Sequence, residues 1–317
     1  MKILVFGRGV ISTQYAWALS QSGNTVTFFV RKGKAELLGE TVSLNIYDAR
    51  KKLKGELIKD EWRIRLIEEL SSDHEYDLIF VSVQHYQLKS VADFLADKIG
   101  NATLFLFNNI WNEPLEVMKA FPRKQLVFGF PVAGGGFDSN GVLNGAFLGK
   151  VTIGTDGTTA PSEREAQVLE LFKGAGFKVT MVSDFRSWLF GHFAVNAAIH
   201  LETLKSQADK PLTDLLRSPR HWRNVIANGK ELIPLLEARQ VDLKYSPDLK
   251  IFKLPPWLLG LLMKVMFKFM PAIKIIFSGH NNEYELKSYS RDVMETADEL
   301  GISLPGFQAF RNLYKIK

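Results

Sequence analysis

The stretch KILVFGRGVIS at residues 2–12 decides the fold. Its apolar part, Lys2 to Phe6, is typical of a short buried strand, and Gly7 to Gly9 predicts a tight turn. Val10 to Ser22 then has the spacing of a helix, and a second apolar run at residues 25–30 predicts another strand. A strand, a glycine turn, a helix and a second strand are the opening of a dinucleotide-binding unit.

Gly7, Gly9 and Ser12 occupy the three small-residue positions of GxGxxG. The first glycine allows the turn, the second lets the backbone approach a pyrophosphate, and the third position needs a small side chain where helix and strand pack. The helix that follows directs its positive end at the phosphates. A glycine turn without a ligand is the alternative. We expect the cofactor contacts at this turn to be Gly7, Arg8, Gly9, Val10, Ile11 and Ser12.

The residues after the second strand indicate which cofactor is bound. NAD-binding chains place an acidic residue there to bind the ribose hydroxyls, whereas this chain has Arg31 and Lys32 and no acidic residue before Glu36. Two cations suit a 2′-phosphate, which Arg31 can bind with two parallel hydrogen bonds. The pattern therefore favours NADP(H), with two ordinary surface charges as the alternative.

The next part of the chain alternates between apolar runs and helical patterns. Asp77 to Val83, Thr103 to Phe107 and Leu126 to Phe130 predict strands, and Gln87 to Lys98 predicts a helix between two of them. This alternation is typical of a parallel sheet with helices on both faces.

Further along, the composition changes. Val132 to Thr159 is rich in Gly and Thr and predicts antiparallel strands that extend the sheet, followed by a helix at Pro161 to Lys173 and a strand at Lys178 to Val182. From residue 184 the patterns are nearly all helical. We therefore predict an α/β fold in which residues 1–183 form a doubly wound, Rossmann-type dinucleotide-binding domain and residues 184–317 form an all-α substrate or dimerisation domain.

Composition limits the classes of function. The 317 residues include no cysteine, which excludes disulfides, thiolate catalysis and cysteine-ligated metals. The formal net charge is +6, but the basic residues are scattered, and no basic and aromatic motif for nucleic acid is present. With no basic leader and apolar stretch at the start, we expect a cytoplasmic protein.

The segment Ile251 to Phe277 is apolar for 27 residues, long enough to raise the question of a membrane span. Four lysines and three prolines interrupt it, which argues against a transmembrane span. Lys264 and Lys268 share one face of a helix predicted at Trp257 to Met270 and leave a broad apolar face. We favour packing in the second domain or at a dimer contact over peripheral membrane binding.

With these residues in view, the chain resembles the ketopantoate reductase family. The resemblance runs in order through KILVFGRGVIS, Arg31, VSVQHYQL, FNN at residues 107–109, WLFGHFAVNAAI and GISLP near the C-terminus. It implies NADPH-dependent reduction of 2-dehydropantoate to pantoate, a step of pantothenate biosynthesis. It also implies that Asn108 acts in cofactor and substrate binding, that Asn196 contacts the substrate, and that Glu285 is the active-site glutamate.

Two positions depart from the family pattern. The family's catalytic lysine lies four residues before the helix asparagine, where this chain has His192, and the lysine after the strand at Asp77 to Val83 is replaced by Gln84. His192, Asn196 and His200 are spaced four apart and form one stripe on a helix. Histidine has an ordinary pKa of about 6.5, which suits a general acid at neutral pH.

The alternatives for His192 are a structural histidine and a site that has lost reductase activity. Lys205 is no ready substitute, because thirteen residues at helical spacing turn it away from the stripe. A metal site is the least favoured option, since the stripe supplies no carboxylate ligand.

The leading hypothesis is an oxidoreductase that uses NADPH to reduce a small 2-keto acid, either 2-dehydropantoate or a close analogue. Asn108 would position the reacting groups, His192 would protonate the developing alkoxide, and Asn196 and Glu285 would bind the substrate, with Gln84 among the cofactor contacts. A homodimer through the C-terminal domain is one option. A non-catalytic NADP-binding protein and a reductase of another carbonyl or imine are the alternatives.

Overall fold

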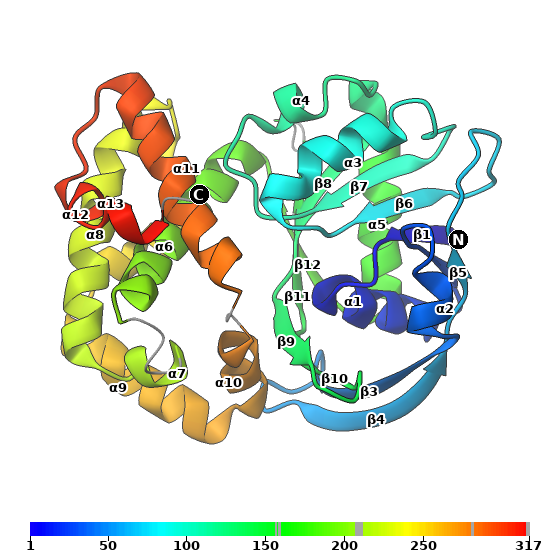
Figure 1. The fold of residues 1–317 in the computed structure, drawn as a ribbon, viewed down its shortest axis with the longest axis horizontal. Helices are drawn as coiled ribbons and strands as arrows, with labels where there is room; N and C mark the ends of the chain where they lie inside the picture. The colour runs from blue at the N-terminus through cyan, green and yellow to red at the C-terminus, as the bar shows by residue number, and fades with distance from the viewer. Residues whose placement is uncertain (156, 158–159, 207–211, 280–281, 315–317) are drawn as a thin grey trace. The chain divides into compact units, whose positions relative to one another are not determined.

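The computed structural model describes residues 1–155, 157, 160–206, 212–279 and 282–314. The chain divides into two compact units. The first contains residues 1–108, 114–183 and 270–279, and the second contains residues 109–113, 184–269 and the chain from residue 280 (Figure 1).

A mostly parallel sheet forms the centre of the first unit. Its strands are β1 (Lys2–Phe6), β2 (Thr25–Phe29), β5 (Leu66–Ile67), β6 (Leu78–Val81), β7 (Thr103–Phe107), β8 (Leu126–Phe130), β11 (Lys150–Gly154) and β12 (Lys178–Val182). They lie in the order β12-β11-β8-β7-β6-β1-β2-β5, and the six from β5 to β8 run parallel. This is the doubly wound order, with its switch point between β1 and β6, so the predicted fold class is confirmed.

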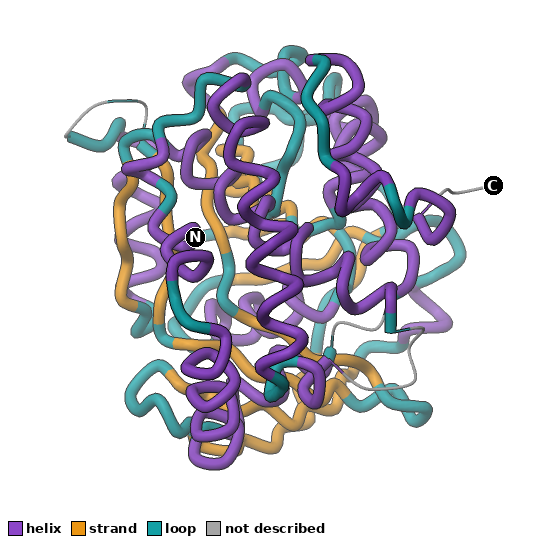
Figure 2. Tube along the Cα trace, turned by 90° about the vertical axis from the view of Figure 1, so that its left-hand side faces the viewer, coloured by secondary structure: helices purple, strands orange, loops and turns teal. Residues whose placement is uncertain are grey.

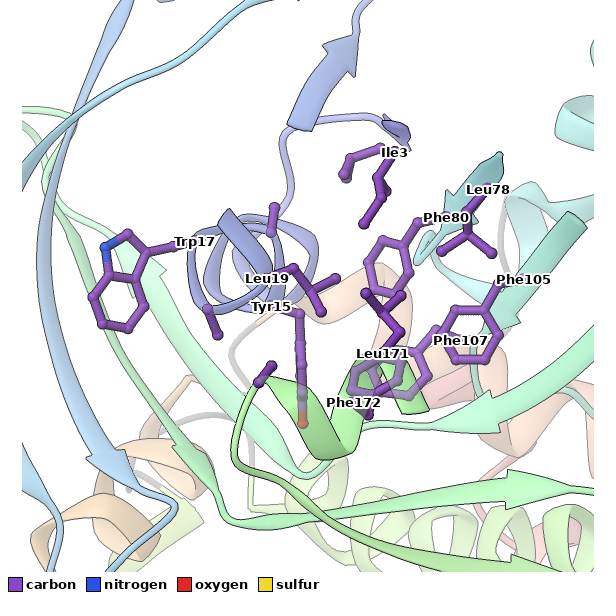
Figure 3. Close-up of a cluster of buried hydrophobic side chains, with 14 of the residues drawn as sticks. Ile3, Tyr15, Trp17, Leu19, Leu78, Phe80, Phe105, Phe107, Leu171 and Phe172 are labelled. Carbon is purple, nitrogen blue, oxygen red and sulfur yellow. The ribbon is translucent and has the colours of Figure 1, made fainter. Parts of the chain in front are cut away.

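Helices and short turns connect these strands. They are α1 (Val10–Ser20), α2 (Ala35–Leu38), the 3₁₀ turn η1 (His85–Gln87), α3 (Leu88–Leu95), α4 (Pro114–Val117), η2 (Arg123–Gln125) and α5 (Glu163–Gly174). Tyr15 of α1 and Phe172 of α5 pack with Phe80 and Phe107 of the sheet in a fully buried aromatic core (Figure 3). Burial of several large rings anchors α1, and with it the glycine turn that precedes it, to the sheet.

A second sheet, which the sequence analysis did not predict, lies in the same unit. Its order is β4 (Glu56–Arg63), β3 (Thr41–Ala49), β10 (Leu143–Leu148) and β9 (Ala133–Phe137). The prediction that Val132 to Thr159 extends the main sheet was therefore wrong for β9 and β10, whereas β11 does join it. Residues 156, 158 and 159 of that segment lie outside the described residues.

Glycines explain why β9 and β10 form a separate layer against α1. A Cβ atom added at Gly145 would lie 2.7 Å from the Gln14 side chain of α1. The Gln14 amide also donates to the Gly134 carbonyl at 3.1 Å. Because glycine has no side chain, β10 can cross directly over α1. Helix α1 lies between the two sheets (Figure 1).

Helix α10 (Pro271–Ser278) belongs to the first unit, although the sequence analysis placed it in the helical domain. It packs against β9 and β10, and a Cβ at Gly134 would lie 2.7 Å from the Ile276 carbonyl oxygen. The chain thus returns from the second unit to complete the first. The division at residue 183 into two functional domains stays a prediction.

The described part of the second unit contains helices and loops but no strand (Figure 2). Its elements are α6 (Phe185–Lys205), α7 (Leu212–Leu215), α8 (Pro219–Ala238), η3 (Leu243–Tyr245), η4 (Pro247–Lys253), α9 (Pro256–Phe269), α11 (Glu283–Leu300), α12 (Pro305–Gln308) and α13 (Arg311–Tyr314). Helix α6 lies at the centre and packs against α8 and α11. This arrangement confirms the helical second region.

The apolar segment from 251 to 277 is divided among η4, α9 and α10. Helices α9 and α10 each begin at a proline. Leu259, Met263 and Phe267 of α9 are buried, whereas Trp257 and Phe269 are 61% and 59% exposed. No helix within the described residues is long and apolar enough to cross a membrane. What covers the outer face of α9 stays a prediction.

Candidate active site

The glycine turn lies at the carboxyl end of β1, beside the switch point of the sheet. Gly7 has φ of +86°, in the region that favours glycine, and its N–H donates to the Phe29 carbonyl at 2.9 Å. Gly9 is the N-cap of α1 and has an ordinary extended backbone. Of the two glycines, therefore, Gly7 is required by the backbone conformation, whereas nothing in the backbone conformation of Gly9 requires glycine.

Ser12 replaces the third glycine and holds the turn together. Its Oγ accepts the Gly9 N–H at 2.9 Å and lies 3.1 Å from the Gly7 and Gly9 carbonyl oxygens. The side chain is completely buried, so it fits where helix and strand pack. The serine thus stiffens the predicted phosphate-binding turn.

Arg8 is half-buried at the turn and lies over the Phe137 ring of β9 at 5.2 Å. Burial lowers the pKa of Arg8, and within the described residues its buried Nε has no hydrogen-bond partner. A buried guanidinium nitrogen without a partner is costly unless an acceptor is supplied. A phosphate oxygen is such an acceptor. The neighbouring Val10 and Ile11 pack partly against the core.

Arg31 and Lys32 are exposed after β2, as the sequence indicates. The structure adds Glu68, which follows β5 and accepts the Ala35 N–H at 2.7 Å. Its hydrogen bonds with the backbone of Ala35 and Gly33 lower the pKa of Glu68. A carboxylate therefore anchors the loop with the two cations. Glu68 was not predicted from the sequence, because it follows β5 and not the strand that precedes Arg31.

Asn108 and Gln84 follow β7 and β6, the next strands across the switch point. The Asn108 amide donates to the Val83 carbonyl and joins the two loops. Its Oδ1 is buried and has no hydrogen-bond partner among the described residues. Gln84 caps η1, and its N–H donates to the Gln87 side chain at 3.2 Å. The carboxyl ends of β1, β2, β6 and β7 thus bring all the predicted cofactor residues to one edge of the sheet.

In the second unit, His192 and Asn196 stand out by their accessibility. All the residues of α6 from Leu189 to Thr203 are buried except these two. The two polar side chains are one helical turn apart and on one face. The third member of the predicted stripe, His200, is 3% exposed and packs on the Tyr289 ring. The accessible part of the stripe therefore consists of His192 and Asn196.

His192 contacts Asp248 and Trp188. Its Nδ1 lies 2.7 Å from Oδ2 of Asp248, at the start of η4. Its ring stacks on Trp188 with centroids 5.2 Å apart and planes 6° apart. Asp248 could not be predicted as a neighbour of His192, because it lies 56 residues away along the chain. The imidazole is thus held on one face and at one nitrogen.

Tyr289 of α11 is hydrogen-bonded to Asn196 and is affected by the charge of Glu285. The Asn109 amide donates a hydrogen bond to the Tyr289 hydroxyl at 3.1 Å. The Asn196 side chain is hydrogen-bonded to the same hydroxyl. Burial raises the pKa of Tyr289, and the negative charge of Glu285 raises it further, so the phenol stays protonated. The structure thus joins two predicted substrate contacts through a buried tyrosine that the sequence analysis did not identify.

Two other groups of residues were considered for this region, a metal-binding cluster and Lys205. No three His, Cys, Asp or Glu side chains among the described residues are arranged to hold a metal ion. Lys205 forms an ion pair with Glu202 at 2.5 Å. The ammonium group of Lys205 is thus engaged by a carboxylate of its own helix.

The glycine turn, the doubly wound order and the helical second unit define a class, the two-unit proteins with a dinucleotide-binding fold. Within that class, residues 3–157 match the family described as ketopantoate reductase PanE/ApbA. The resemblance to the ketopantoate reductase family is thereby confirmed.

Several known proteins are similar to the chain. A 2-dehydropantoate 2-reductase of Archaeoglobus fulgidus is 26% identical over 166 residues, which are 51% of this chain and 54% of that protein. The match thus spans about half the length of the relative. D-mandelate dehydrogenase with NADH and anilino(oxo)acetate has a TM-score of 0.71 at 15% identity, with 99% and 97% of the two chains covered. A 2-dehydropantoate 2-reductase of Geobacter metallireducens has a TM-score of 0.72 at 14% sequence identity, and the match covers 99% of each chain. At these identities the structural matches show the fold.

Proposed function

We propose that the protein is an NADPH-dependent reductase of a small 2-keto acid, with 2-dehydropantoate as the first candidate substrate. The observation that carries the proposal is the pair His192 and Asn196, the two accessible side chains in the buried part of α6. They stand where the family has a proton-donating lysine and a substrate-binding asparagine. A histidine there can perform the same proton transfer.

The residues of the first unit fit a nicotinamide dinucleotide. The unpartnered Arg8 Nε and Asn108 Oδ1 are a donor and an acceptor that such a ligand would satisfy. The N-terminus of α1 would face the pyrophosphate, and Arg31 and Lys32 would hold a 2′-phosphate. When bound, NADPH supplies the hydride for the keto carbon.

The side chains of the second unit supply the remaining steps. His192 would donate a proton to the carbonyl oxygen as the carbon is reduced, which prevents an alkoxide from building up. Asn196 would donate a hydrogen bond to the substrate, and Glu285 would accept one from a hydroxyl group. Tyr289, protonated and bonded to Asn196, would fix the orientation of that amide. Asn108 would position the reacting groups.

The similarity to D-mandelate dehydrogenase widens the substrate class to be tested. That protein was solved with an oxo acid that carries an aromatic group and with NADH. The assay therefore follows oxidation of NADPH and NADH with 2-dehydropantoate, pyruvate and benzoylformate. We expect turnover of at least one keto acid and a higher kcat/KM with NADPH. Tight NADPH binding without turnover of any keto acid would instead support a non-catalytic NADP-binding protein.

Three further predictions stay attached to this proposal. They are a homodimer through the C-terminal domain, a place in pantothenate biosynthesis and a cytoplasmic location. The mass of the protein in solution, measured by light scattering, tests the first of them.

A further inference from the structure

We propose that Asp248 is the positioning residue of His192, and that the segment from Asp242 to Asp248 is fixed on α6 for this purpose. The inference rests on the proposed function, because it assigns a task to the residue that would donate the proton. Its first support is the 2.7 Å contact between His192 Nδ1 and Asp248 Oδ2.

The contact distinguishes the two nitrogens of the ring. A carboxylate next to Nδ1 accepts the Nδ1–H bond and fixes the tautomer, so the proton for transfer is carried at Nε2. The parallel stack on Trp188 prevents the ring from turning, and Trp188 itself stacks on Phe185 with planes 7° apart. Carboxylate and indole together hold the imidazole in one orientation.

The chain that carries Asp248 is fastened to α6 at two points. Ser246 Oγ donates to the Ser187 carbonyl at 2.7 Å, and the Asp242 N–H donates to Ser187 Oγ at 2.9 Å. Ser246 is 2% exposed and precedes Asp248 by two residues. Because both bonds end on one residue of α6, the position of η4 along the helix is fixed.

Gly191 allows this close approach. A Cβ atom there would lie 2.3 Å from both Cβ and Oγ of Ser246, so any side chain would push η4 away from α6. Gly191 has no positive φ, so the backbone does not require glycine. The glycine immediately before His192 is thus explained by space for the segment that carries Asp248.

Several charged groups on neighbouring elements interact with partners other than His192. Arg186 near the start of α6 pairs with Glu113 at 2.6 Å, and Lys244 of η3 pairs with Asp242 at 2.5 Å. Glu285 of α11 acts on Tyr289, and His221 of α8 is affected by Glu202. Of these carboxylates, Asp248 is the one in contact with His192.

The proton balance is complete with these groups. The imidazolium of His192 would give its Nε2 proton to the carbonyl oxygen as the keto carbon is reduced, and the ring would become neutral with its Nδ1–H still bonded to Asp248. The Asp248 carboxylate would accept the Nδ1–H bond and take up no proton in this step. The His192 side chain is 23% exposed, so water can return the proton to Nε2 after the alcohol leaves.

The test compares wild type with Asp248→Asn, and with Asp242→Asn as a matched loss of a carboxylate from the same segment. Without substrate, ¹⁵N spectra of histidine-labelled protein report which nitrogen of neutral His192 carries the proton, with His192→Gln to assign the signal. We expect Nδ1–H in wild type and in Asp242→Asn, and a shift towards Nε2–H in Asp248→Asn.

In turnover, Asp248→Asn should lower kcat by about a hundredfold and leave the KM for the keto acid and the Kd for NADPH within about threefold. An unchanged tautomer and an unchanged kcat would overturn the proposal. If wild type reduces no keto acid, the proposed function fails, but the ¹⁵N spectra still decide whether Asp248 orients His192.

A second pair of variants covers the case in which Asp248→Asn does not fold. Gly191→Ala should displace η4, disturb the tautomer and lower kcat. Adding Ser246→Gly to this variant removes Cβ and Oγ of Ser246, the two atoms that clash with the new Cβ. The double variant should recover part of the Nδ1–H tautomer and part of kcat. Wild-type kcat and tautomer in Gly191→Ala would contradict the role given to the segment.

Discussion

The glycine turn of the first unit and helix α6 of the second unit form their sites in different ways. At the turn, the geometry comes from the backbone, through the positive φ of Gly7 and the bonds that Ser12 makes to the turn. On α6, it comes from side chains that distant segments supply, Asp248 beside His192 and Tyr289 beside Asn196. A backbone site is encoded by adjacent residues, whereas the side-chain site depends on how helices pack.

We expect the largest effect from a substitution in the glycine turn. Gly9→Val should weaken NADPH binding about a hundredfold, the loss of one or two charge-assisted hydrogen bonds to the pyrophosphate, and should leave the fold intact. The fold should tolerate it because Gly9 has an extended backbone and its nearest neighbour, Ser12 Oγ, lies 3.4 Å from an added Cβ. Isothermal titration measures the affinity. Gly136→Val, at a glycine with open space around it, is the control.

The second prediction tests whether side-chain packing makes the second unit sensitive to acid. Burial lowers the pKa of His221 to about 4, below the value of about 6.5 for an unfolded histidine. The unfolded state therefore takes up the proton first, and stability is lost as the pH falls from 6.5 towards 4. From pH 7 to pH 5, the free energy of unfolding should fall by about 2 kcal/mol more in wild type than in His221→Gln. An equal fall of the urea midpoint from pH 7 to pH 5 in the two proteins would contradict it.

The third prediction concerns cofactor choice. Arg31→Ala should weaken NADPH binding about tenfold through loss of a charge-assisted bond to the 2′-phosphate, and should change NADH binding little. Lys34→Ala, the loss of an exposed cation in the same loop, is the matched control. Thermal stabilisation by each cofactor measures the difference. Equal stabilisation by NADPH and NADH that does not change in Arg31→Ala would remove the case for NADPH.

The smallest effect concerns the loop anchor. Glu68→Ala removes the acceptor of the Ala35 N–H and should weaken NADPH binding about fivefold, because the loop with Arg31 and Lys32 loses its fixed position. Glu69→Ala changes the exposed neighbouring carboxylate and serves as the control. Tighter NADPH binding in Glu68→Ala would show instead that this carboxylate repels the 2′-phosphate.

Features encoded in adjacent residues could be predicted from the sequence. The strands Thr103–Phe107, Leu126–Phe130 and Lys178–Val182 lie where the apolar runs placed them. The second sheet was missed, although Val42, Leu44 and Ile46 alternate with polar residues in Thr41–Ala49, the usual sign of a half-buried strand.

Partners distant in sequence could not be predicted. Asp248, Glu68 and Tyr289 leave no local signal, since each acts on a residue from another element. Helix α10 was assigned to the helical domain because its sequence is helical, but the glycines of β9 that receive it lie more than a hundred residues earlier. The family resemblance indicated His192 and Asn196 on α6. Their neighbours, Asp248 and Tyr289, were found only in the structure.

The central claim is that His192 donates the proton that the family takes from a lysine. The most direct measurement is the single-turnover rate of NADPH oxidation by a keto acid, in wild type, His192→Ala and His192→Lys, with NADPH affinity as the control. We predict that His192→Ala lowers the rate by about a hundredfold or more at unchanged NADPH affinity, and that His192→Lys recovers part of it. A rate in His192→Ala equal to that of wild type would contradict the claim.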